Sequence, residues 1–361
     1  MKHTRGFSLV ELMIALLIGL IVVAGLISVF VAEHSVYRTA SAQAAIQNAE
    51  NGISFIVTPV LRAAGFAGCG NLTQAVPLVV PAATPLPYNL AVPVMGFDAV
   101  GTAGSGTYVL ASLNPANDGN ATHWSPALDA TLLNRVEQGS DVVATVGQLL
   151  GTAPVGVTSI IAGAATFVIG ANTNPPILVG QIAAVSNCGN GSSFRVTDVT
   201  GNTIGHAAGL NISGTFNPDY TGPGPGIDLR PQFVPLQQTV FFVGKGDGGQ
   251  SALWQATLDG VVAAPSSSGW TFQEIVPGVD NMQVLYGIGP GGVNQQYVAA
   301  SAVIDWTAVN SIRLGFLVEG PIGSSPSATT FSVLGTTVTV PADTRLRHVY
   351  VMTVDLRNTT P

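Results

Sequence analysis

The stretch LMIALLIGLIVVAGLISVFVA, residues 12–32, contains no charged residue and no proline. As an α-helix it would extend about 31 Å, enough to cross the hydrocarbon core of a bilayer. Lys2 and Arg5 precede the stretch and Glu33 follows it. The positive-inside rule therefore predicts a cytoplasmic N-terminus and an exported remainder of the chain.

This apolar stretch has two ordinary explanations, a cleaved signal peptide and a simple membrane anchor. The stretch is longer than the 7–15 apolar residues of a usual signal peptide, and the nearest small-x-small site, residues 40–42, lies beyond Glu33 and Arg38. Neither explanation accounts for Glu11, which lies in the otherwise apolar run FSLVELMIALL. An ionisable group at membrane depth is costly, so it marks a function and should have a partner.

The segment GFSLVE, Gly6 to Glu11, resembles the class III signal sequence of type IV prepilins and pseudopilins. The resemblance implies that a membrane prepilin peptidase cuts after Gly6, removes residues 1–6 and methylates the new N-terminal Phe7. It also implies that Glu11 pairs with the α-amino group of a neighbouring subunit during assembly. Such pairing relieves the cost of burying a carboxylate and an ammonium separately.

Beyond residue 32 the pattern remains helical but becomes amphipathic, as in the exposed half of a pilin helix. Pro59 predicts a kink or a new short helix capped by Thr58, and Gly65 and Gly68 predict the helix end. One apolar stripe is expected to face a core: Ile46, Ala49, Ile53, Ile56, Val57, Val60 and Ala64.

The remainder of the chain is predicted to be β-rich, with long loops. Val, Ile, Thr and aromatic residues fill short runs that are bounded by Gly, Pro, Asn and Asp. We therefore expect an α+β, type IV pilin-like fold in which one long N-terminal helix packs on a β-rich head. The expected parts are a leader (1–6), a transmembrane or filament-core helix (7–32), an amphipathic helical half (33–64) and an exported head (65–361). The expected strands are 141–146, 165–169, 177–185, 193–199, 239–243, 253–258, 282–286, 311–318, 331–340 and 349–356.

Several segments further resemble the PilW family of minor pilins. They are ENG (50–52) with LRAAGFAGC (61–69), GSDVV (139–143), AAVSNC (183–188) with FRVT (194–197), VDNMQVLYG (279–287), and RLR (345–347) through TVDLRN (353–358). The resemblance implies a low-abundance subunit that is held in the inner membrane and then moves into an extracellular pilus. There it would prime assembly and sit at the tip, in support of twitching motility, adhesion or DNA uptake. The implied partners are the prepilin peptidase, other minor pilins, the major pilin, the assembly platform of the inner membrane and a PilY-type tip adhesin. A pseudopilin of type II secretion is the alternative within this architecture.

The two cysteines, Cys69 and Cys188, both fall in the part expected to be exported, where disulfides persist. Their pairing would close a loop of about 120 residues and would contribute about 4–5 kcal/mol on the chain-entropy model. Two unpaired or metal-bound thiols are the alternative. Because no Cys/His pair has the spacing of zinc ligands, neither a metal nor a cofactor is expected.

Charge is scarce: only 9% of residues are charged, with 12 Lys and Arg against 19 Asp and Glu. DNA binding is therefore not expected, although a tip module that recognises a surface ligand or DNA stays open as a second class of function. Arg345, Arg347 and His348 form the basic cluster of the head, which favours a strand-edge charge or a subunit contact. The five histidines are scattered and belong to no recognisable catalytic motif, so the chain is not expected to be an enzyme.

Overall fold

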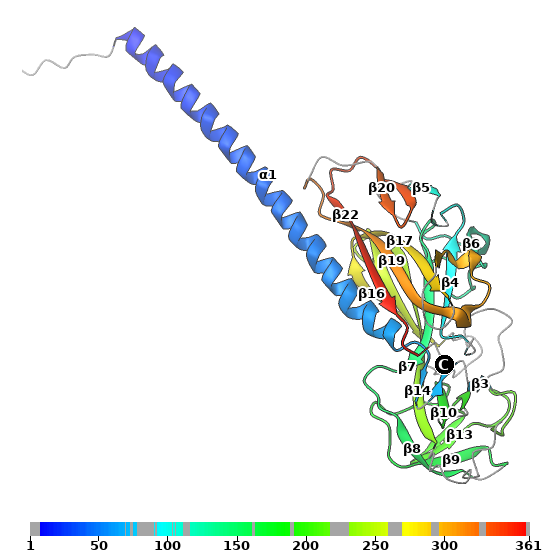
Figure 1. Ribbon diagram of the computed structural model, residues 1–361. Coiled ribbons are helices and arrows are strands. Elements are labelled where there is room, and N and C mark those ends of the chain that lie inside the picture. The colour runs from blue at the N-terminus through cyan, green and yellow to red at the C-terminus, as the bar shows by residue number, and fades with distance from the viewer. Residues whose placement is uncertain are drawn as a thin grey trace, which may run out of the picture.

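The computed structural model describes residues 8–68, 70–72, 75–77, 90, 92–102, 104, 106–110, 116–160, 163–187, 191–216, 231–258, 269–289, 296–324 and 330–358. One long helix, α1 (Leu9–Arg62), projects from a β-rich head (Figure 1). This arrangement confirms the predicted fold class. Within the described residues, α1 is the one helix that is long and apolar enough to cross a membrane.

Helix α1 runs without interruption through Pro59, so the predicted new helix capped by Thr58 is wrong. Proline lacks the N–H that would bond the carbonyl group of Phe55. Both residues lie on the solvent-exposed side of the helix, and Phe55 is 82% exposed, so water can satisfy that carbonyl. The helix ends three residues later at Arg62, before Gly65, whose φ of +77° favours glycine.

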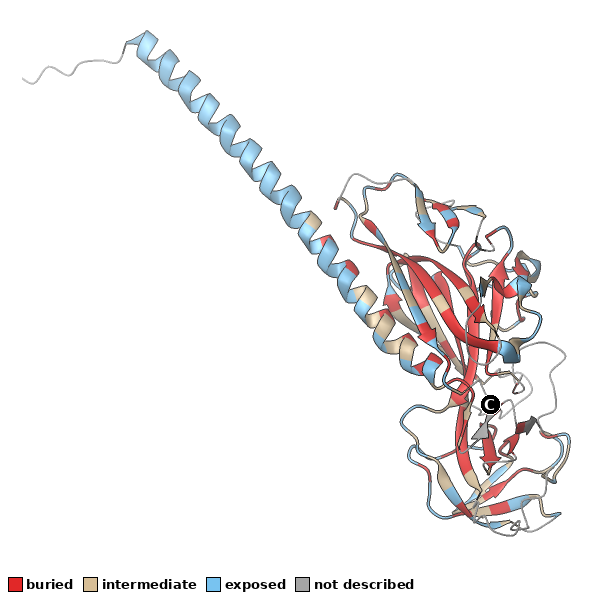
Figure 2. Cartoon of the chain, in the orientation of Figure 1, coloured by how far each residue is buried: buried red, intermediate tan, exposed pale blue. Residues whose placement is uncertain are grey.

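The C-terminal half of α1 packs on the head through the predicted apolar stripe. Ile53, Val57 and Leu61 are completely buried, and Ile46 and Val60 are nearly so. They join the largest hydrophobic core, which also contains residues of β17, β19 and β22. Figure 2 shows the change along the helix, from an exposed N-terminal half to a half that is buried on the side facing the head.

A branched sheet of thirteen strands forms most of the head. At its centre lies β14 (Gln232–Lys245), which pairs first with β10 and β8 and then with β7 and β15. The long strand therefore connects a distal lobe with the part of the head that meets α1 (Figure 1). The other strands are β3 (Ala75–Pro77), β4 (Val94–Ala99), β6 (Trp124–Ser125), β7 (Val142–Gln148), β8 (Val155–Ile160), β9 (Thr166–Ile169), β10 (Ile182–Ser186), β11 (Gly191–Arg195), β12 (Asp198–Thr200), β13 (Thr203–Gly205), β15 (Ser251–Leu258) and β16 (Trp270–Pro277).

A second, four-stranded antiparallel sheet lies under α1, in the order β18–β17–β19–β22. Its strands are β17 (Val279–Ile288), β18 (Gln296–Val298), β19 (Val309–Glu319) and β22 (Arg347–Asp355). Two small sheets complete the head, one of β1 (Phe66–Ala67) and β2 (Gly70–Asn71), the other of β5 (Thr107–Val109), β20 (Thr330–Val333) and β21 (Thr336–Thr339). Three short 3-10 helices span Ala121–His123 (η2), Ala300–Ala302 (η4) and Trp306–Ala308 (η5).

Three of the predicted strands are divided or begin late in the structure. The segment 331–340 forms a hairpin, because Leu334 (φ +47°) and Gly335 (φ +92°) make a tight turn at its centre. The segment 193–199 divides between β11 and β12, and the first residues of 177–185 form a turn before β10 begins at Ile182.

Candidate functional site

The N-terminal end of α1 carries the one acidic group of the apolar half-helix. Ser8 caps the helix: its Oγ accepts a hydrogen bond from Val10 N (3.3 Å), and its backbone N donates to Glu11 Oε2 (3.2 Å). Glu11 therefore occupies the third position of a capping box, where its charge also meets the positive end of the helix dipole. The predicted cleavage and methylation positions, Gly6 and Phe7, lie outside the described residues.

Sequence reasoning missed the role of Ser8, although a signal was present. The spacing Ser8-x-x-Glu11 is the capping-box pattern that often precedes an apolar helix. A glutamate that binds the backbone of its own helix end has a fixed position. The carboxylate is thus held beside the point where the predicted mature chain would begin.

The apolar side chains that follow Glu11 have no protein cover. From Leu9 to Val31, the large hydrophobic side chains are 52–76% exposed, on every side of the helix (Figure 2). Soluble monomers rarely expose an apolar surface of this extent, so lipid or other helices must cover it. Farther along the helix, Thr39 Oγ1 donates a hydrogen bond to the carbonyl group of Ser324 in the head (2.9 Å).

The predicted basic cluster is largely neutralised inside the head. Arg347 contacts Asp280 (2.5 Å), Asp343 (2.7 Å) and Glu319 (3.2 Å). Arg345 contacts Glu319 (2.6 Å) and Asp343 (3.5 Å). All five side chains are at most 13% exposed. The two arginines therefore join β17, β19 and β22 and do not form a free cationic surface.

The third member of that cluster, His348, has a different role. Its Nδ1 lies 2.5 Å from Glu50 Oε1 of α1, and its side chain is 62% exposed. This pair connects the edge strand β22 with the helix. Sequence reasoning grouped the three basic residues, but alternation along the strand places Arg347 and His348 on opposite faces.

A buried pair of carboxylates, which sequence reasoning did not identify, joins the two large sheets. Asp141 accepts hydrogen bonds from Ala99 N at the end of β4 and from Val284 N in β17, both at 2.8 Å. Asp98 accepts from Ser301 Oγ (2.9 Å). Burial raises the pKa of both aspartates, and because both are only 3% exposed they have a structural role and cannot meet a substrate directly.

Two of the segments quoted for the family resemblance meet at this junction. Asn281 and Gln283 both donate through their amide groups to the carbonyl oxygen of Gly139, and Ser140 Oγ accepts from Met282 N. The segments 139–143 and 279–287 therefore form one interface between the sheets.

Cys69 and Cys188 lie outside the described residues, but their neighbours are described. Ser186 Oγ donates a hydrogen bond to the carbonyl oxygen of Ala67, so the residues two positions before each cysteine are in contact. Among the described residues, no group of three or more His, Cys, Asp or Glu side chains has the arrangement of a metal site.

Comparisons with known proteins match both ends of the chain. The family model described as type IV pilus-assembly protein W matches residues 240–358, which contain β15 to β22, and the prokaryotic N-terminal methylation motif matches residues 1–27. None of the curated proteins compared with the chain matches it. Among solved structures, the chain is similar to a type IV-like pilin from Thermus thermophilus, with 22% identity, a TM-score of 0.22, and coverage of 35% of this chain and 67% of that chain. The chain therefore matches a prepilin methylation motif at its N-terminal end and the PilW family model over its C-terminal third.

Proposed function

We propose that the chain is a minor pilin that primes assembly of a type IV pilus and then sits in its tip complex. One observation carries this proposal: the apolar N-terminal half of α1 is exposed, while the rest of the helix packs on the head. The exposed half holds one carboxylate, that of Glu11, which is positioned at the start of the helix. The apolar half can stay in the inner membrane before assembly and pack among other pilin helices afterwards. The processes served would be twitching motility, adhesion or DNA uptake.

Processing would prepare the end of the helix for assembly. Prepilin peptidase would cut after Gly6, remove the leader 1–6 and methylate Phe7, so that the new α-amino group adjoins the capping residue Ser8. Glu11 uses Oε2 for the cap, and within the described residues no hydrogen bond reaches its Oε1. That oxygen would accept a hydrogen bond from the N-terminal ammonium group of a neighbouring pilin. The pairing would relieve the cost of burying the carboxylate and the ammonium separately.

The partners of the head follow from this placement. The chain would associate with other minor pilins and with the major pilin, receive force from the assembly platform of the inner membrane, and present its distal lobe near a PilY-type adhesin. DNA is not expected as a ligand, because acidic neighbours neutralise Arg345 and Arg347.

A disulfide between Cys69 and Cys188 would support the head under load. The contact between Ala67 and Ser186 favours this pairing, because it places the two chain segments side by side. The bond would attach the segment that follows α1 to the distal lobe.

Mass spectrometry of purified pili tests the proposal directly. Glu11→Gln should leave the amount of chain in the membrane unchanged but lower its amount in pili at least about tenfold, since a loss of only 1.4 kcal/mol already has this effect. Glu33→Gln, at the other end of the apolar stretch, is the matched control and should assemble normally. Equal incorporation of the Glu11 variant would overturn the pairing, and a wild-type chain found in secretion pseudopili but not in pili would replace the pilus with the pseudopilus.

A further inference from the structure

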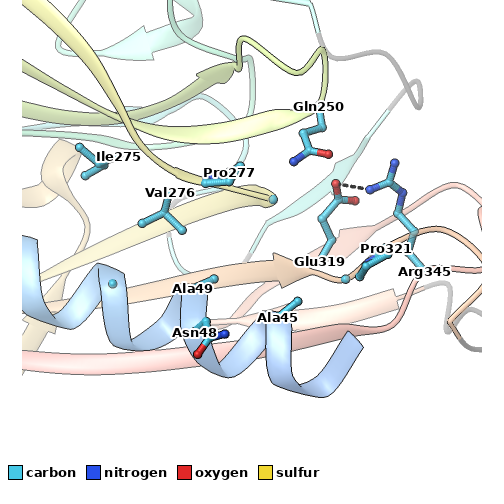
Figure 3. Close-up of a pocket in the computed structure, with 13 residues that line it drawn as sticks. Ala45, Asn48, Ala49, Gln250, Ile275, Val276, Pro277, Glu319, Pro321 and Arg345 are labelled. Carbon is cyan, nitrogen blue, oxygen red and sulfur yellow. Dashed lines mark hydrogen bonds and ion pairs between the residues drawn. The ribbon is translucent and has the colours of Figure 1, made fainter. Parts of the chain in front are cut away.

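A pocket of about 460 Å³ lies where α1 meets the head. Its walls come from the helix, from the end of strand β16 and from the segment that follows β19 (Figure 3). Figure 3 shows the carboxylate of Glu319 and the guanidinium of Arg345 side by side at one end, close to Gln250 and Pro321. The volume is in the range of pockets that hold small molecules or inserted side chains.

Small residues on the helix leave this space open. Ala45, Ala49 and Gly52 follow each other at intervals of four and three residues, so they share one face of α1. Ile275 and Pro277 of β16 form the opposite apolar wall. A longer side chain at position 49 would fill the pocket.

The polar end of the pocket has one more acidic group than basic groups. Asp280, Glu319 and Asp343 form ion pairs with Arg345 and Arg347, so the formal sum is 2 − 3 = −1 when all five are ionised. A buried cluster with an unbalanced carboxylate requires either a bound proton or a further cation. Glu319 is the carboxylate of this cluster that lines the pocket.

We propose that this pocket binds the side chain of a lysine from a partner chain. The four-carbon stem would pack against Ala49 and Ile275, as lysine stems do on apolar surfaces, and the ammonium would approach Glu319. The two oxygens of this carboxylate already bind two flat guanidinium groups, and a compact ammonium can reach them more easily than a third planar cation could. An anionic side chain would find no free cation among the described residues there, because Arg345 and Arg347 already pair with carboxyl groups.

The protonation of Glu319 determines the proton balance of the proposed binding. Burial first, and then the nearby charge of Asp280, raise the pKa of Glu319 to about 8, against the opposing effect of Arg345 and Arg347. The titratable groups that face it are these arginines and Asp280, while Glu50 of α1 is engaged by His348. At neutral pH the carboxyl group therefore holds a proton that an arriving ammonium would displace.

Calorimetry on the full chain in detergent micelles tests this inference. The probe is N-acetyl-lysine methylamide, and N-acetyl-norleucine methylamide, with the same stem and no charge, is its control. We expect the lysine probe alone to bind, with a Kd on the order of 1 mM, as for a single side chain. Titrations at pH 7 in two buffers of different ionisation enthalpy should show release of about one proton per probe.

Two variants test the apolar space of the pocket and the carboxylate of Glu319 separately. Ala49→Leu should abolish binding, while Ala44→Leu, at an exposed helix position outside the pocket, should leave it unchanged. Glu319→Gln should weaken binding at least tenfold and remove the proton release. Equal binding of both probes, no binding of the lysine probe at about 10 mM, or full binding by the Ala49→Leu variant would each overturn the proposal. Because the assay contains no pilus, its failure would leave the proposed role in assembly untouched.

Discussion

Glu137 predicts an unusual dependence of stability on pH. The residue is 5% exposed, its Oε1 accepts a hydrogen bond from Ser251 Oγ (3.1 Å), and within the described part of the chain its Oε2 has no partner. Burial first, and then the charge of Asp280, raise the pKa of Glu137 from 4.5 to about 8, although the bond from Ser251 opposes this shift. The folded protein should therefore keep a proton on Glu137 at neutral pH.

The direction of the effect follows from proton linkage. Between pH 4.5 and 8 the unfolded chain has lost the proton of Glu137 while the folded chain retains it. The free energy of unfolding therefore falls as pH rises through this window, by at most about 1.4 kcal/mol per pH unit for one such group. Between pH 5 and pH 7 the contribution of Glu137 should decrease by about 2–3 kcal/mol.

The Glu137→Gln variant isolates this contribution, because glutamine has nearly the same shape and does not titrate. Urea unfolding of the full chain in detergent micelles, followed by tryptophan fluorescence at pH 5, 6 and 7, gives the free energy of unfolding of each protein. The difference, wild type minus variant, should decrease steadily as pH rises. A difference that stays constant over this range would refute the reasoning, since it would mean that Glu137 ionises at its ordinary pKa.

Three other changes test the packing of the helix, a buried hydroxyl group and the cysteine pair. Ile53→Ala, in the helix–head core, should lower the free energy of unfolding by about 2–5 kcal/mol, while Ile304→Ala, at a fully exposed position, should have almost no effect in the same urea assay. Tyr286→Phe should raise the melting temperature, because the buried hydroxyl of Tyr286 has no partner within the described residues and such a group costs about 1–3 kcal/mol; a fall would reveal a hidden partner. Peptide mapping without reduction should yield one linked fragment that contains Cys69 and Cys188, and Cys188→Ser should lower stability by about 4–5 kcal/mol; two free thiols would exclude the bond.

The helix and its orientation could be predicted from the sequence because they depend on local patterns. Apolar spacing alone identifies the side of α1 that packs on the head, and Ile53 and Val57 are completely buried as expected. The predicted start of a new helix was wrong at Pro59, where local propensity disfavours a continuous helix. Only the position of Pro59 on the solvent side of the last turn explains why the helix continues.

The strands were harder to predict because their length depends on partners that lie far away in the sequence. Sequence patterns predicted 239–243, whereas β14 begins at Gln232 and includes Pro235. At Pro235 the strand changes partners, from β10 to β7, and a missing N–H is tolerated there. Strand β16 was missed because it lies at a sheet edge, with polar side chains such as Gln273 and Glu274 among the apolar ones.

The candidate sites divide in the same way. Glu11 could be identified from the sequence because it is the one ionisable residue in an otherwise apolar run. The neutralisation of Arg347 could not be predicted, because Asp280 is 67 positions distant and only the pairing of β17, β19 and β22 brings the two together.

Charged residues are even scarcer at the surface of this protein than its composition suggests, because many of its acidic residues are buried. At least seven of its 19 acidic residues are buried in the head: Asp98, Asp129, Glu137, Asp141, Asp280, Glu319 and Asp343. Burial raises the pKa of five of them, which are Asp98, Glu137, Asp141, Asp280 and Glu319. These groups gain protons on folding, so mild acid should favour folding through them. His206 acts in the opposite direction: burial lowers its pKa from 6.5 to about 4, so its contribution to stability decreases as pH falls through that window. An exported subunit in which most of the buried carboxylates bind protons more readily when folded than when unfolded has little to lose when the surrounding medium becomes acidic.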